Sequence, residues 1–84
     1  MPIFAAERVY DPPVTQERFE LGSATLAPCI AARDITWIES LLSVDGTRSV
    51  CTFEASDADS LREATGIAGV RPFSRVYQVN VYKP

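Results

Sequence analysis

The chain has 84 residues, of which 46% are hydrophobic and 23% are charged, and its formal net charge at pH 7 is −3. This length and composition predict a single globular domain over residues 1–84, close to the size at which one hydrophobic core only just suffices. The acidic balance, without any cluster of basic residues, argues against binding to the phosphate backbone of nucleic acids.

The same sequence limits location and chemistry. No apolar run approaches the roughly 20 residues that cross a bilayer, so we expect no membrane partner. The first residues lack the basic and apolar regions of a signal peptide, which predicts a cytoplasmic location. Histidine is absent, so Ser-His-Asp and Cys-His catalytic arrangements are excluded within this chain. Cys29 and Cys51 lack CxxC spacing and are expected to be reduced, partly buried thiols.

The first two elements are a strand and a helix. Residues 3–10 are rich in strand-forming side chains, and two prolines end this strand. Thr15 is suited to cap a following helix. The buried stripe of that helix recurs at helical spacing and comprises Phe19, Ser23, Leu26 and Ile30. Pro28 removes one helical hydrogen bond, so either the helix kinks there or its regular part ends near Ala27.

The centre of the sequence predicts a β-hairpin. Residues 35–43 and 48–55 flank Asp45-Gly46, one of the strongest hairpin signals. An even-length turn pairs Ser40 with Cys51, Glu39 with Thr52 and Ile38 with Phe53. Alternation then gives one face suited to helices (Ile38, Ser40, Leu42, Cys51, Phe53 and Ala55) and a second face (Trp37, Glu39, Leu41, Val50, Thr52 and Glu54). A single β-bulge would exchange the faces of one strand.

A second helix and a last strand follow the hairpin. Ser56-x-x-Asp59 resembles a capping box, and Gly66 or Gly69 should end this helix. Residues 75–82 alternate as a strand. Their two faces are Tyr77, Val79 and Val81 on one side, and Val76, Gln78, Asn80 and Tyr82 on the other.

The order β-α-β-β-α-β predicts an α+β, ferredoxin-like domain with a four-stranded antiparallel sheet and both helices on one face. The other face is left without cover. We expect it to carry an apolar set consisting of Ile3, Trp37, Leu41, Val50 and Val76. An apolar face of this extent is typical of an interface, so a homodimer packed sheet to sheet, as an α/β barrel, is the expected assembly.

Several motifs together resemble a known family. They are Phe4-x-x-Glu7-Arg8, Cys29, Trp37-x-x-Ser40, Ser43-x-Asp45-Gly46-x-Arg48, Cys51-x-x-Glu54-Ala55-x-Asp57-Ala58 and Pro72-Phe73-x-Arg75-Val76. The sequence is similar to a family of small bacterial proteins that includes a nickel-binding, nickel-responsive protein. The resemblance implies a ferredoxin-like dimeric α/β barrel and a divalent metal such as nickel.

The candidate site is a polar cup on the uncovered face. Its expected members are Glu7, Glu39, Thr52, Glu54, Gln78 and Asn80, arranged around Trp37. Such a cup could hold a cation or a small polar ligand, because unpaired buried carboxylates are costly. In the structural alternative, Glu7 pairs with an arginine while Glu39 and Glu54 are solvated.

Glu7 and Cys51 are the candidate metal ligands. Nickel favours imidazole or thiolate ligands, and Cys51 is a thiol in one of the matching motifs. Its predicted place on the helix-covered face also suits a buried structural residue. Because oxygen-only sites discriminate poorly for nickel, the residues themselves predict weak nickel binding.

Three classes of function remain open. The first is a homodimer that binds a small ligand or a metal ion, supported by the acidic cup. The second is a cofactor-independent barrel enzyme such as a cyclase, an isomerase or a small monooxygenase, which rests on analogy with similar folds. The third is a structural or regulatory protein whose sheet face meets another chain.

Overall fold

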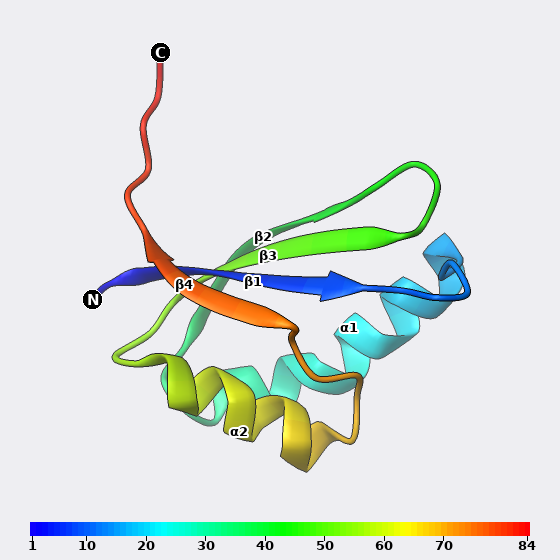
Figure 1. The fold of residues 1–84 in the computed structure, drawn as a ribbon. Coiled ribbons are helices and arrows are strands. Elements are labelled where there is room, and N and C mark those ends of the chain that lie inside the picture. The colour runs from blue at the N-terminus through cyan, green and yellow to red at the C-terminus, as the bar shows by residue number, and fades with distance from the viewer.

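The computed structural model describes residues 1–84 and has the predicted order of elements. They are β1 (Ile3–Val9), α1 (Gln16–Ala31), β2 (Thr36–Leu42), β3 (Arg48–Glu54), α2 (Ala58–Ala68) and β4 (Arg75–Val79). The sheet has the order β2-β3-β1-β4 with every neighbouring pair antiparallel. Both helices cover one face of this sheet (Figure 1). The predicted ferredoxin-like α+β fold is therefore confirmed.

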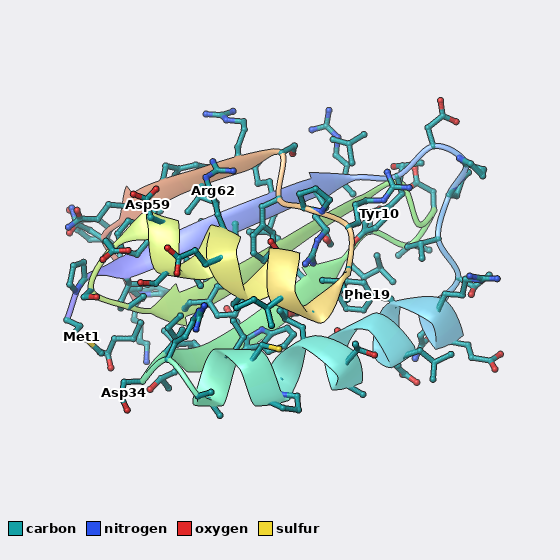
Figure 2. All side chains as sticks on the ribbon, turned by 90° about the horizontal axis from the view of Figure 1, so that it is seen from below. Met1, Tyr10, Phe19, Asp34, Asp59 and Arg62 are labelled. Carbon is teal, nitrogen blue, oxygen red and sulfur yellow. The ribbon has the colours of Figure 1, made fainter.

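The hydrophobic core lies between the sheet and the two helices, which stand in front of the sheet in Figure 2. Its buried members are Phe4, Ala6, Leu26, Ile30, Ile35, Cys51, Phe53, Ala55, Leu61, Ala64 and Phe73. Phe53 joins two other rings, with its centroid 5.2 Å from that of Trp37 and 5.9 Å from that of Phe73. Aromatic pairs at these separations stabilise a core beyond the area that they bury.

Helix α1 continues through its internal proline. Thr15 caps the helix as predicted, since its hydroxyl accepts a first-turn backbone N–H. The helix does not end near Ala27 but runs through Pro28 to Ala31. Leu26 and Ile30, on either side of the proline, are almost completely buried. Their burial against the sheet offsets the hydrogen bond that Pro28 cannot donate.

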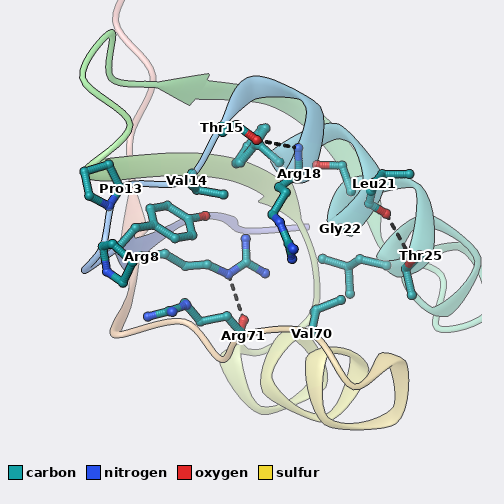
Figure 3. A pocket seen from close by; sticks show the side chains of 15 residues that line it. Arg8, Pro13, Val14, Thr15, Arg18, Leu21, Gly22, Thr25, Val70 and Arg71 are labelled. Atoms are coloured by element: carbon teal, nitrogen blue, oxygen red, sulfur yellow. Dashed lines mark hydrogen bonds between the residues drawn. The ribbon is translucent and has the colours of Figure 1, made fainter.

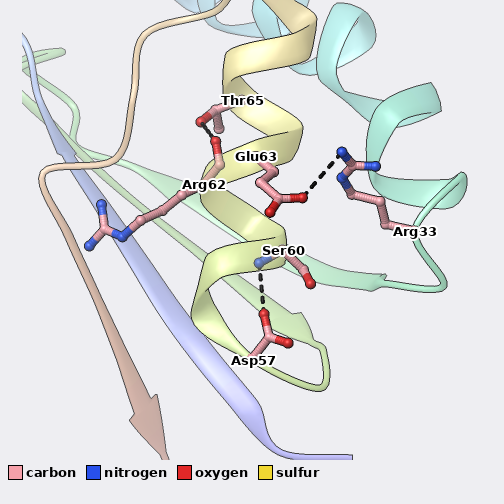
Figure 4. A network of polar contacts seen from close by, with 6 residues as sticks. All are labelled: Arg33, Asp57, Ser60, Arg62, Glu63 and Thr65. Carbon is pink, nitrogen blue, oxygen red and sulfur yellow. Dashed lines mark hydrogen bonds and ion pairs between the residues drawn. The ribbon is translucent and has the colours of Figure 1, made fainter.

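Helix α2 begins one residue later than a capping box at Ser56 requires. The N-cap is Asp57, whose Oδ1 accepts the backbone N–H of Ser60 at 2.8 Å (Figure 4). Hydrogen bonds from Ser60 hold the pKa of Asp57 below its usual value. The helix ends at Gly69 rather than at Gly66, because Gly69 has a φ of 70° and takes the left-handed conformation of a C-cap.

A β-bulge changes the predicted faces of β2. The register confirms two of the predicted pairs, Ser40–Cys51 and Glu39–Thr52. Beyond them Trp37, not Ile38, lies opposite Phe53, and Ile38 is the extra residue of the bulge. Trp37 therefore packs on the helix side, where its Nε1 donates to Ser40 Oγ at 2.9 Å. The prediction that Trp37 lies on the uncovered face and Ile38 on the covered face is wrong.

The predicted faces of β4 are exchanged as well. Val76 lies opposite Ala6 and packs against the core, whereas Tyr77 is on the opposite face. Gln78 consequently lies on the helix side of the sheet, as Val76 does. The prediction that Gln78 belongs to the uncovered face is wrong. The strand ends at Val79, so Asn80, Val81 and Tyr82 lie in the C-terminal segment beyond it.

Neither α1 nor α2 has the length and hydrophobicity that a membrane-spanning helix requires.

Candidate functional site

The face of the sheet turned away from the helices is called the open face here. Its side chains, from the strand register, are Ile3, Ala5, Glu7 and Val9 of β1, Thr36, Glu39 and Leu41 of β2, Arg48, Val50, Thr52 and Glu54 of β3, and Arg75, Tyr77 and Val79 of β4. Large apolar groups on or beside it are accessible, with Leu41 62%, Val9 51% and Ile38 48% exposed. The open face thus combines carboxylates with uncovered apolar surface.

Glu7 and Tyr77 make a polar contact on the open face. The Tyr77 hydroxyl donates a hydrogen bond to Glu7 Oε2, and this bond raises the pKa of Tyr77 above its usual value. The Arg75 guanidinium carbon lies 5.1 Å from the centroid of the Tyr77 ring. No salt bridge involves Glu7, since the single salt bridge of the structure joins Arg33 and Glu63. The structure therefore lacks the ion pair between Glu7 and an arginine that the structural alternative expected.

Thr52 carries a polar atom that the chain leaves unsatisfied. Its hydroxyl is buried and has no hydrogen-bond partner. It borders a pocket of about 660 Å³, whose lining residues are Ile3, Ile38, Glu39, Thr52, Val81 and Lys83. The C-terminal segment that supplies Val81 and Lys83 leaves the sheet on the side away from the helices (Figure 1). The pocket therefore places a carboxylate and an ammonium group beside Thr52 on the open face.

The structure places only part of the predicted set on the open face, and only Glu39 and Thr52 of it line the pocket described above. Glu7, Glu39, Thr52 and Glu54 share the open face as expected. Trp37 and Gln78 have the parity of the helix side, and Asn80 lies beyond the end of β4. Sequence reasoning missed Tyr77 and Lys83, because no turn fixes the register of β4 against β1 and no strand pattern extends to Lys83.

Cys51 and Glu7 cannot share one metal ion within the chain. Cys51 is fully buried and lies opposite Ala6 on the helix side, whereas Glu7 is on the open face. Burial raises the pKa of the Cys51 thiol, and Ser40 Oγ donates to its sulfur at 2.9 Å. The chain holds no group of three or more His, Cys, Asp or Glu residues that could hold a metal ion. The donors of one subunit therefore do not fit nickel.

Comparisons with known proteins place this geometry in a family. The model of the SCO4226-like nickel-responsive proteins matches residues 4–79. The crystal structure of SCO4226 from Streptomyces coelicolor A3(2) superposes with a TM-score of 0.84 at 10% sequence identity, over 96% of this chain and 99% of that one. That likeness shows a shared fold. No curated protein sequence matches the chain. Because the family model spans nearly the whole sequence, the chain belongs to the SCO4226-like family of nickel-responsive proteins.

Proposed function

We propose that this chain acts as a homodimer whose open faces pack together and enclose a binding site for a small polar ligand or a cation. The observation that carries the proposal is the sheet face without cover, on which Leu41 and Val9 are more than half exposed beside the carboxylates Glu7, Glu39 and Glu54. An apolar surface of this kind that lies open to water is typical of an interface. Packing against a second copy would remove it from water.

The chemistry of the open face favours a second copy as its occupant. Exposed apolar groups such as Leu41 and Ile38 supply surface whose burial contributes roughly 25 cal/mol per Å². The same face carries carboxylates, such as Glu54, and cations, such as Arg48 and Arg75. In a two-fold symmetric dimer each copy presents the same patch, so these opposite charges can face one another. A partner with charges of only one sign would leave either the carboxylates or the arginines of the open face without an opposite charge.

The ligand would lie where carboxylates of both copies meet. Glu7, Glu39 and Glu54 offer oxygen atoms, and a dimer doubles their number. Oxygen donors suit hard cations and polar organic groups better than they suit nickel. The name of the family supports a metal ion as the ligand, whereas the donor set of this chain favours a hard cation over nickel.

The assembly is tested by placing a charge on the open face. Leu41→Glu is expected to convert the dimer into a monomer, measured by light scattering after size exclusion, because a buried unpaired carboxylate is costly. Ile67→Glu is the matched control, since Ile67 is 66% exposed on α2, away from the open face. It should leave the dimer intact. A monomeric wild-type protein, or a Leu41→Glu variant that remains dimeric, would refute the proposed interface.

A further inference from the structure

A second pocket lies on the helix side of the sheet, separate from the open face. It has a volume of about 690 Å³ and is bordered by the end of β1, the first half of α1 and the segment that follows α2 (Figure 3). The proposed dimer does not use this pocket, so the residues that line it require a separate explanation.

Three arginines line the pocket, and no carboxylate does. Arg8, Arg18 and Arg71 are all lining residues, whereas no aspartate or glutamate is among them. The whole chain has only 8 lysines and arginines against 11 acidic residues. Since the single salt bridge lies elsewhere, none of the three arginines is neutralised by an ion pair. The pocket is thus a positive region on an acidic protein.

Arg8 is the most informative member of this group. It is only 7% exposed, and burial of an uncompensated charge is costly. Its Nε donates to the backbone oxygen of Arg71 at 2.8 Å, and its guanidinium lies 4.1 Å from the centroid of the Phe73 ring. These contacts orient the guanidinium but supply no negative charge. Arg18 extends toward Arg8 across the pocket in Figure 3, so two like charges face the same space.

The other walls of the pocket are apolar, or their polar groups already have partners within the chain. The Tyr10 hydroxyl is hydrogen-bonded to Ser49, and the Arg71 guanidinium stacks over the Tyr10 ring at 5.4 Å. Phe19 and Val70 add apolar surface next to the arginines. A ligand that fits these walls has a charged head beside the arginines and an apolar body along α1.

We propose that this pocket binds a small organic anion, with a carboxylate or phosphate head held by Arg8 and Arg18 and an apolar body against Phe19 and Val70. The planar guanidinium matches either head group through paired hydrogen bonds. The anion supplies the charge that Arg8 lacks within the chain. This site is independent of the proposed dimer and of any ligand on the open face.

The proposal is tested by NMR titration with phenylacetate, phenyl phosphate and the neutral analogue phenylacetamide. At least one of the two anions should shift the amide signals of residues lining the pocket, with a dissociation constant on the order of 1 mM or tighter. The anion that binds identifies the head group. Absence of binding by both anions, equal binding of phenylacetamide, or shifts confined to the open face would overturn the proposal.

Variants separate charge recognition from folding. Arg18→Gln, at an exposed position, should remain folded and weaken anion binding roughly tenfold or more, because a charge-assisted hydrogen bond is lost. Arg33→Gln removes the same charge just beyond the other end of α1, outside the pocket, and should leave affinity unchanged. Unchanged binding in folded Arg18→Gln, or an equal loss in Arg33→Gln, would contradict the assignment.

Discussion

The hydrogen bond between Tyr77 and Glu7 links the outer strand β4 to the central strand β1 on the open face. Because this bond stabilises the protonated phenol, the pKa of Tyr77 is raised in the folded state. The contribution of the bond to stability is fully present below the ordinary tyrosine pKa of about 10. It is lost as the pH rises from that value through the folded-state pKa, since the unfolded chain ionises first.

This coupling predicts how Tyr77 titrates. Glu7→Gln should lower the pKa of Tyr77 toward the ordinary value, because the carboxylate and its charge are removed. Ultraviolet difference titration measures tyrosine ionisation, and Tyr77→Phe identifies the contribution of this residue. An identical titration of Tyr77 in wild type and Glu7→Gln would show that the two side chains do not interact in solution.

The hairpin between β2 and β3 depends on one glycine. Gly46 has a φ of 75°, and a Cβ atom at this position would clash with the backbone oxygen of Val14. The preceding Asp45 accepts hydrogen bonds from Ser43 and Thr47, which closes the turn. The turn therefore connects the hairpin to the segment before α1 as well as reversing the chain.

Two glycine substitutions should have opposite effects. Gly46→Ala is expected to lower the free energy of unfolding by about 2 kcal/mol or more, through backbone strain and the clash with Val14. Gly66→Ala, inside α2 with no atom within 4 Å of the added Cβ, should raise it by about 0.5–1 kcal/mol. Urea denaturation measures both, and a tolerated Gly46→Ala would contradict the described turn.

The elements were predictable where a local signal exists. Asp45-Gly46 fixes the hairpin, helical spacing identifies α1, and a capping signal followed by a glycine marks α2. The bulge at Ile38 has no signal of this kind, because it is stabilised by the packing of Trp37 on Phe53 and by the hydrogen bond to Ser40. Such long-range packing overrides simple alternation along a strand.

The candidate site was predictable to a similar extent. Glu7, Glu39, Thr52 and Glu54 lie on strands whose faces follow from alternation or from the hairpin register. Tyr77 was placed on the wrong face because β4 reaches β1 through a long connection, so no turn sets their register. The arginine pocket was missed because Arg8 and Arg18 lie on a strand and a helix whose relative placement the sequence does not give. Arg71 is 63 residues beyond Arg8 and joins them only in the folded chain.

Because helices cover the sheet on one side only, the potential metal donors of the chain are divided between its two faces. The helices bury the Cys51 thiol and leave carboxylates on the open face. Thiolate and carboxylate ligands are therefore separated by the sheet itself. Within one chain Cys51 and the open-face carboxylates therefore cannot bind the same metal ion.

Nickel affinity should accordingly be low. We expect a dissociation constant no tighter than tens of micromolar, roughly −6 kcal/mol, by calorimetry on protein without an affinity tag. Glu7→Gln should weaken any binding, since Glu7 is a carboxylate of the open face. Submicromolar affinity that is lost in Cys51→Ser and retained in Glu7→Gln would show that the thiol is a ligand after all.

The proposed dimer encloses a ligand between the open faces of two copies. Native mass spectrometry of the untagged protein tests both parts of this proposal, because one spectrum reports stoichiometry, bound metal and bound small molecule. We expect a dimer mass with additional ligand or cation mass, and a ligand-free monomer for Leu41→Glu. A wild-type monomer, or a dimer without added mass even after incubation with divalent cations and cell extract, would contradict it.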